Sequence, residues 1–260
     1  MVVYYVNSKG EKLNLMKSPY RVVDADWFDS DWEENSSGYE RTVSIDVFGK
    51  RADFKSNMER LYKIIAVDSE LGVYGKLYVN NTYLRCKIKS SRKSGWKGYI
   101  FSEAELVFQA PALEWIQEVN KKFYKMPSNM PGHGANYSFN YPYNYAVDET
   151  GLSQMLIDHV ISSDFKMIIY GPCEDPRIEV NNYPYEVFTT LEEGEYLVID
   201  SAESTITKYA EDGTTSNLFN DRSFEYSVFK QMPAGLLTFI WNGEFGFDLI
   251  LYLKRREAKW

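Results

Sequence analysis

Oxygen-bearing side chains recur along residues 29–40 with the spacing of a calcium-binding loop. An EF-hand places its ligands at positions 1, 3, 5, 7, 9 and 12 of a twelve-residue loop. Here those positions hold Asp29, Asp31, Glu33, Asn35, Ser37 and Glu40. Position 6 needs glycine for its sharp turn, and Glu34 occupies it instead. Two interpretations remain, a calcium site and a solvated acidic loop; the missing glycine favours the loop, so we predict no metal.

Motifs that carry catalysis are absent. The sequence contains no GxSxG elbow, no HExxH helix and no glycine-rich phosphate loop. Cys173 precedes Glu174, and an acidic neighbour raises the pKa of a thiol, which disfavours a nucleophile. The 37 acidic residues make any chosen glycosidase pair uninformative. We therefore predict no catalytic residue, no cofactor and no enzymatic activity.

Two runs of opposite charge lie in the first half of the chain. Residues 24–34 hold six acids and no base, and residues 85–97 hold six bases and no acid. Both runs could be solvated loops. Alternatively, they meet across neighbouring subunits of a ring, where a head-to-tail contact joins two different patches, and salt would weaken that contact. The candidate interface residues are Asp24, Asp26, Asp29, Asp31, Glu33 and Glu34 on the acidic side and Arg85, Lys87, Lys89, Arg92, Lys93 and Lys97 on the basic side.

Aromatic residues alternate with polar residues or proline between positions 137 and 145, so one face of a strand would carry a strip of rings. The strip consists of Tyr137, Phe139, Tyr141, Tyr143 and Tyr145. Exposed, it could stack on sugars or contact a protein. We favour a place in the core or at a seam between domains, because sugar-binding rings rarely form an uninterrupted row.

Length and charge predict two domains. A chain of 260 residues exceeds the usual size of one domain. Residues 1–125 carry 20 basic and 17 acidic side chains, whereas residues 126–260 carry 9 and 20. Between these halves lies a stretch rich in proline and glycine, KMPSNMPGHGAN, which predicts domains at 1–126 and 127–260.

The first half reads as strands with one helix. Residues 43–47 alternate between apolar and polar, as in a half-buried strand. Ser56 and Glu59 form a capping box that predicts a helix start. An apolar stripe then follows at helical spacing and ends before Gly72; its members are Met58, Leu61, Tyr62 and Ile65.

A hairpin is expected around the basic run. Alternation predicts strands at 84–89 and 103–108. A register centred on Gly95 would set Arg85 opposite Glu105 and Lys87 opposite Glu103, pairing opposite charges.

The second half is dense in short strands, which predicts a sandwich or barrel. Asp212-Gly213 and Asn242-Gly243 mark tight turns, and we expect the second turn to join residues 239–241 and 245–251 in a closing hairpin. Residues 152–161 fit a helical stripe or a strand. The other predicted strands are 165–170, 178–180, 185–189, 196–200 and 204–209.

Composition excludes several classes of protein. The net charge of −8 repels DNA and anionic membranes. Cys86 and Cys173 form no CxxC pair, which argues against a disulfide framework or structural zinc. No apolar stretch approaches the roughly 20 residues of a membrane span, and the start does not look like a signal peptide.

The chain resembles the distal tail proteins of long-tailed bacteriophages and prophages, a family of siphovirus tail-tip hub proteins. Short motifs in a shared order carry the likeness, which spans nearly the whole chain, with one departure at Ala258, where the family has proline. The motifs lie at residues 7–11, 58–66, 75–78, 84–88, 106–111, 141–143, 169–176, 194–200, 204–206, 217–219, 232–235 and 254–260.

This resemblance implies a mainly β protein with two modules. The first would be a β-sandwich with one helix that forms a ring, usually a hexamer, and the second a galectin-like β-sandwich. Such proteins join the tail tube and tape-measure protein to the tail-associated baseplate protein or fibres, and DNA passes through the ring. The expected location is the virion tail tip, after synthesis in the bacterial cytoplasm. For residues 156–161 the resemblance favours a strand. The alternative function is a free-standing galectin-like carbohydrate-binding module; a glycan hydrolase is a more distant one.

Overall fold

A computed structural model describes residues 1–126 and 151–260. These residues form two compact units: unit 1 contains Met1–Glu118 and Lys254–Trp260, and unit 2 contains Val119–Leu253. This division lies after Glu118 and after Leu253, and not at the predicted boundary of 126/127. Two strands cross it, β10 (Trp115–Phe123) and β21 (Phe247–Arg255), so each has residues in both units. The boundary between the two packed units therefore differs from the point at which charge and glycine content change along the sequence.

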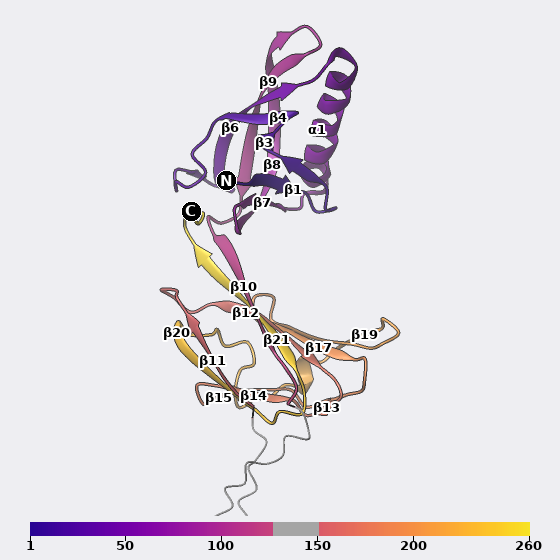
Figure 1. Cartoon of the computed structure of the whole chain (residues 1–260), viewed down its shortest axis with the longest axis vertical. Coiled ribbons are helices and arrows are strands. Elements are labelled where there is room, and N and C mark those ends of the chain that lie inside the picture. Colours follow the sequence, from indigo (N-terminus) through magenta and orange to yellow (C-terminus); the bar gives the residue numbers. More distant parts are fainter. Residues whose placement is uncertain (127–150) are drawn as a thin grey trace, which may run out of the picture. The chain divides into compact units, whose positions relative to one another are not determined.

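Unit 1 contains two antiparallel sheets that share β8 (Thr82–Lys97) (Figure 1). The first part of β8 pairs with β7 and β10, and the second part pairs with β9. The strands of the first sheet are β1 (Val3–Val6), β2 (Lys12–Asn14), β7 (Gly75–Val79), β8 and β10. Those of the second are β3 (Met16–Lys17), β4 (Tyr20–Asp24), β5 (Glu33–Asn35), β6 (Gly38–Phe48), β8 and β9 (Phe101–Ala110).

The predicted strand at 43–47 is confirmed within β6, and its apolar residues Val43, Ile45 and Val47 are fully buried. Alternation identified it because only one face of β6 meets the core. The predicted faces of the strand at 84–89 are confirmed as well, since Leu84, Cys86 and Ile88 are all buried.

The single predicted helix is confirmed as α1 (Arg51–Leu71), which packs against β6 and β8. It ends as expected at Gly72, whose φ of 67° lies in the left-handed region that favours glycine. The predicted start was wrong. Ser56 lies inside the helix, Lys50 is the N-cap and provides no side-chain cap, and Tyr62 is exposed instead of joining the apolar stripe.

The predicted hairpin register was also wrong. Strands β8 and β9 do form a hairpin, but Arg92, not Arg85, stands opposite Glu105, and Ser94 stands opposite Glu103. Gly95 is not the turn: it has a φ of 58° and lies in a bulge between Ser94 and Lys97. A glycine serves a bulge as well as a turn, so its position alone did not define the register.

A buried carboxylate lies beneath the first sheet of unit 1. Asp68 is fully buried and accepts hydrogen bonds from the Tyr5 hydroxyl and, at 2.9 Å, from the Ser8 amide. Burial and the Asp68 hydrogen bond raise the pKa of Tyr5. Gly75 lies against this group, where a Cβ atom would come within 2.3 Å of the Val6 carbonyl oxygen and 2.6 Å of the Asp68 carboxylate.

Residues 254–260 complete unit 1. Ala258, the one departure from the family motif, is buried in the unit 1 core. The Lys259 amide donates to the Thr82 hydroxyl at 3.4 Å. The Trp260 ring stacks on Phe28 with 3.9 Å between centroids.

Unit 2 is a β-sandwich. One core cluster joins the inner faces of its two larger sheets, with Phe123, Phe239 and Phe247 in contact across it. One sheet consists of β19 (Thr215–Asn217), β18 (Thr205–Tyr209), β17 (Tyr196–Asp200), β12 (Asp164–Tyr170) and β21; the other of β11 (Gly151–Ile157), β20 (Gly235–Trp241), β14 (Arg177–Val180) and β15 (Tyr183–Glu186). A short pair, β13 (Cys173–Glu174) with β16 (Thr190–Leu191), and a 3-10 helix, Phe219–Asp221, complete the elements.

The predicted strands at 165–170, 178–180, 196–200 and 204–209 are confirmed to within two residues. The strand expected at 185–189 is displaced, since β15 covers Tyr183–Glu186. The turn at Asp212-Gly213 joins β18 and β19 as expected, with a Gly213 φ of 84°.

Two other predictions for unit 2 were wrong. β20 and β21 do not pair: β20 pairs with β11 and β14, whereas β21 pairs with β12 in the opposite sheet. The strand expected at 156–161 is β11, which ends at Ile157, and Leu152, Leu156 and Val160 are exposed. Within residues 1–126 and 151–260, no helix has the length and apolar character needed to cross a membrane.

Candidate functional site

The acidic segment of unit 1 folds as a tight hairpin. β5 pairs with the start of β6, so that Glu33 stands opposite Glu40 and Asn35 opposite Gly38. The Asn35 side-chain oxygen accepts hydrogen bonds from the Ser37 amide and hydroxyl at 2.9 and 2.8 Å. A hairpin extends its residues along two strands, whereas a calcium loop wraps them around one point.

The Asp29 carboxylate forms an ion pair of 2.5 Å with the Arg41 guanidinium. Among residues 1–126 and 151–260, no three His, Cys, Asp or Glu side chains gather as they would around a metal ion. Asp26, Asp31, Glu33 and Glu34 remain exposed to solvent. We call Asp31, Glu33 and Glu34 the acidic end of unit 1.

The basic run divides into two parts along β8. Lys89 forms an ion pair of 2.8 Å with Glu40, which also accepts a hydrogen bond of 2.9 Å from Gln109. Arg85 and Lys87 lie over the ring of Tyr74, at 5.7 and 5.4 Å from its centroid. The second part continues to the hairpin tip and consists of Arg92, Lys93 and Lys97, of which Arg92 and Lys97 are exposed.

The ion pair between Lys89 and Glu40 predicts a pH-dependent contribution to stability. The Lys89 hydrogen bond lowers the pKa of Glu40 below its ordinary value of 4.5. A lowered carboxyl pKa stabilises the fold above the unfolded value and is lost as pH falls through the folded value. Lys89→Met should therefore cost less than about 1 kcal/mol at neutral pH, because Lys89 is half exposed and screened.

Urea unfolding of the wild type and Lys89→Met at neutral pH and at a pH below the lowered pKa measures this difference. The difference should vanish at the acidic pH. Lys63→Met is the control, since the exposed Lys63–Glu59 pair is longer, at 3.9 Å. An unchanged cost at both pH values would contradict the assignment.

The start of α1 adds positive charge beside the tip of the β8–β9 hairpin. The Gly49 amide donates to the Ile100 carbonyl at 3.1 Å, and Arg51 lies 5.6 Å from the Tyr99 ring centroid. These contacts place exposed Lys50 and Arg51 beside the hairpin tip. We call Lys50, Arg51, Arg92 and Lys97 the cationic tip. The sequence analysis missed Lys50 and Arg51 because it started the helix at Ser56, and only contacts across the fold bring them to residues 92–97.

Exposed aromatic side chains accompany these charges. Trp96 is 57% exposed although its ring meets Phe54, with 5.7 Å between centroids. Tyr99 and Ile100 at the turn are equally exposed. The tip therefore combines positive charge with apolar surface, a composition that suits a protein interface.

The acidic end and the cationic tip lie at opposite ends of one sheet. β6 and β9 pair from Tyr39 opposite Ala110 to Phe48 opposite Phe101. The acidic strand β5 joins β6 at the Ala110 end, and the hairpin tip lies beyond Phe101. At about 3.4 Å per residue, the length of β9 separates them by about 30 Å. The two patches cannot meet within one chain.

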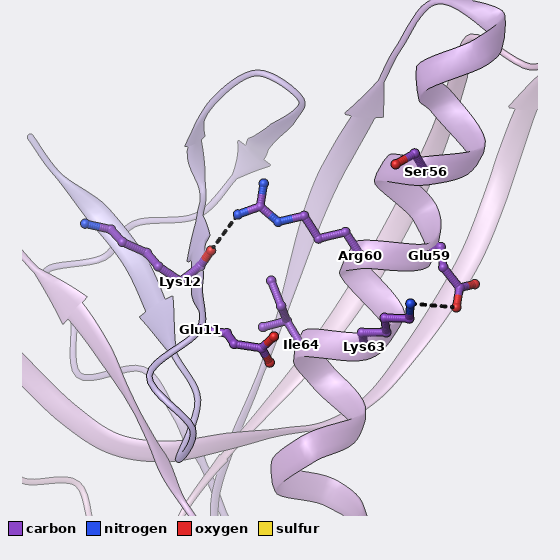
Figure 2. A pocket seen from close by; sticks show the side chains of 7 residues that line it. All are labelled: Glu11, Lys12, Ser56, Glu59, Arg60, Lys63 and Ile64. Atoms are coloured by element: carbon purple, nitrogen blue, oxygen red, sulfur yellow. Dashed lines mark hydrogen bonds and ion pairs between the residues drawn. The ribbon is translucent and has the colours of Figure 1, made fainter.

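A groove of about 420 Å³ lies between β2 and α1 (Figure 2). Two of its charged side chains have partners there: Arg60 donates to the Lys12 main-chain carbonyl at 3.3 Å, and the Lys63 ammonium lies 3.9 Å from the Glu59 carboxylate. The residues that line it are Glu11, Lys12, Ser56, Glu59, Arg60, Lys63 and Ile64. This set pairs no nucleophile with a base, so the groove does not resemble a catalytic centre.

Both cysteines are buried free thiols. Burial, together with the charge of Glu244, raises the pKa of Cys173 to about 11. The adjacent Glu174, which the sequence suggested as the cause, is not the neighbour responsible. Burial likewise raises the pKa of Cys86. Because the thiolate is the nucleophilic form of cysteine, the raised pKa values disfavour both residues as nucleophiles at neutral pH. The aromatic strip predicted at residues 137–145 lies outside the described residues.

Over nearly its whole length the chain has the fold of proteins from phage baseplates. It is similar to a chain of the phage P2 baseplate in its activated conformation with calcium, at 11% identity and a TM-score of 0.60, covering 99% of each chain. A chain of the phage p2 baseplate with strontium gives 12% identity and a TM-score of 0.61, covering 99% of this chain and 100% of that one.

A third similar structure is the Dit protein of phage SPP1, described as a paradigm of the hub adsorption apparatus in phages that infect Gram-positive bacteria. It shares 8% identity, with a TM-score of 0.52, and covers 98% of this chain and 100% of that one. At these identities the likeness establishes the fold. No protein-family model matches the sequence, and no curated protein matches it.

Proposed function

We propose that this chain is a distal tail protein, a structural hub at the tip of a phage tail. One observation carries the proposal: the fold agrees with phage baseplate and Dit hub structures across both units and from end to end. A match restricted to one sandwich would carry little weight, because β-sandwiches serve many functions. Two units matched in the same order are far more specific.

The hub role calls for self-assembly, and the charges of unit 1 suit it. A ring is built from head-to-tail contacts, in which each subunit presents two different patches to its neighbours. The acidic end and the cationic tip are such a pair, since about 30 Å of sheet separates them. We propose that the acidic end of one subunit meets the cationic tip of the next in a ring, most simply a hexamer.

Within a virion, this ring would connect the tail tube and tape-measure protein to the tail-associated baseplate protein or fibres. DNA would pass through its channel without sequence-specific contacts. The protein would be made in the host cytoplasm and act at the tail tip, with no membrane partner, cofactor or catalytic step. Its function would rest on shape and self-association.

Size-exclusion chromatography with light scattering tests the proposal. At low ionic strength we expect a discrete species near six times the 30.3 kDa of one chain. In molar salt the same protein should shift toward monomer, because exposed charges are screened within about 3 Å. A monomer at every protein concentration, coupled with binding to a glycan array, would instead support the carbohydrate-binding module.

A further inference from the structure

Unit 2 carries an arginine that is held between two aromatic rings. The guanidinium carbon of Arg222 lies 3.8 Å from the ring centroid of Phe219 and 4.7 Å from that of Phe224. One of its nitrogens donates to the Phe219 carbonyl oxygen. Stacking of this kind fixes the plane of the guanidinium and leaves its remaining N–H groups at the edge.

This guanidinium has no carboxylate partner in the part of the chain that the structure describes. The ion pairs found there involve other cations. Arg177, in the same unit, shows the contrast, since it pairs with both Glu179 and Glu186. Arg222 is therefore positioned by rings and free to take an anion.

A cavity of about 310 Å³ adjoins the guanidinium. Among the described residues, three serines and three phenylalanines line it with Arg222, and no acidic residue does. Ser223 is only 7% exposed, and its amide donates to the Glu186 carbonyl at 3.1 Å.

The rings of this site suit protein contact better than sugar stacking. Phe219 has Arg222 over its ring and also stacks with Phe229, at 6.0 Å and 22° between planes. With neighbours already stacked on it, Phe219 offers little face to a sugar. Phe224 is 75% exposed, and Phe188, whose amide donates to the Asp221 carbonyl at 2.7 Å, is also exposed. An exposed aromatic ring beside an arginine is typical of interface hot spots.

The net charge of residues 126–260 further restricts the kind of ligand that this cavity would bind. Residues 126–260 carry 9 basic and 20 acidic side chains, so this half repels a polyanionic polysaccharide as a whole. A protein surface that has no other net charge and presents a single carboxylate is not repelled in this way, and its carboxylate can still pair with the Arg222 guanidinium. Such a group can bond bidentately to the guanidinium edge.

We propose that the Arg222 cavity receives an acidic side chain of another protein, whose apolar neighbours pack on Phe224 and Phe188. The carboxylate would accept hydrogen bonds from the guanidinium edge, and from the Ser223 hydroxyl. This site lies within unit 2, and its chemistry does not depend on ring formation by unit 1.

Saturation-transfer NMR on the full-length protein tests the proposal with two blocked peptides, acetyl-Leu-Glu-Leu-amide and acetyl-Leu-Gln-Leu-amide. The glutamate peptide should bind, and the glutamine peptide should bind about tenfold more weakly, because it cannot form charge-assisted hydrogen bonds. Arg222→Lys should weaken the glutamate peptide by a similar factor, since lysine keeps the charge but loses the planar fork. Arg222→Gln should abolish the preference for glutamate.

Two further variants keep the test decisive. Phe224→Ala removes an exposed ring with little risk to folding and should reduce transfer to the leucine methyl groups. Arg177→Gln, at an arginine already ion-paired, should change nothing. Equal binding of the two peptides, no binding of either to folded protein, or full binding by Arg222→Gln overturns the proposal. Tighter binding of glucuronate or inorganic phosphate than of the glutamate peptide would assign the cavity to a sugar acid or a phosphate instead.

Discussion

Replacing Asp31, Glu33 and Glu34 with lysine is expected to convert the assembled protein into a monomer of 30.3 kDa. These acids are exposed at the acidic end of unit 1, so the substitutions should leave its fold intact. In a head-to-tail contact they would place lysines against Arg92 and Lys97 of the next subunit. Like charges in an interface cost several kcal/mol. Light scattering at low ionic strength measures the loss.

The reciprocal variant sharpens this test. Replacing Lys50, Arg92 and Lys97 with glutamate should also give a monomer, because acidic patches then face one another. Mixing the two variants should restore assembly, since each supplies the charge that the other has lost at both contacts. Restoration would identify the pairing of patches as well as its existence.

A matched control separates interface charge from net charge. Replacing Glu192, Glu193 and Glu211 with lysine adds the same six units of charge to exposed positions of unit 2. This control should assemble as the wild type does. Assembly by the Asp31, Glu33 and Glu34 variant, or its loss in the control, would rule out the proposed contact.

Gly75→Ala should destabilise unit 1 by about 3 kcal/mol or more, the cost of forcing atoms into a packed interior without space for them. The added methyl would lie 2.3 Å from the Val6 carbonyl oxygen, which is backbone and cannot swing aside. It would also press on Asp68 and Tyr5, which are buried and hydrogen-bonded to each other. Relief would require separating β7 from β1.

Tryptophan fluorescence in urea isolates this effect. Five of the six tryptophans belong to unit 1, and Trp241 alone belongs to unit 2. Gly72→Ala is the control: its φ of 67° is strained for alanine, but nothing lies within 4 Å, so it should cost about 1 kcal/mol. A smaller loss for Gly75→Ala than for Gly72→Ala would contradict the packing argument.

Patterns with one buried face were predictable from sequence. Val43, Ile45 and Val47 alternate with polar residues because β6 has one apolar side, and that alternation located the strand. Gly72 likewise marked the helix end, because its backbone conformation favours glycine. These signals are local, so neighbouring residues suffice to interpret them.

Pairing between strands was not predictable in the same way. Trp241 and Phe247 both face the core with a glycine turn between them, which suggested a hairpin. Their rings meet edge to face at 5.4 Å, from opposite sheets of the sandwich. The alternation of apolar and polar residues is the same whether two consecutive strands pair in one sheet or lie in opposite sheets of the sandwich. Only the full fold distinguishes the two arrangements.

The candidate interaction surfaces were partly predictable for the same reason. The charge runs were visible in the sequence, but Lys89 and Asp29 prove to be engaged by Glu40 and Arg41 within the chain. Phe219 and Phe224 lie close to Arg222 in the sequence, but their contacts with its guanidinium and the absence of an ion pair among the described residues are visible only in the fold.

The course of β10 and β21 through the boundary makes unit 2 an insertion between two segments of unit 1. During translation, unit 2 can therefore complete its fold before unit 1 does, because unit 1 also needs residues 254–260, which leave the ribosome last. A fragment cut at residue 118 would lack Ala258 and leave a hole in the core that it fills. Excising residues 119–253 and bridging the gap with a short linker would preserve every piece of the first unit.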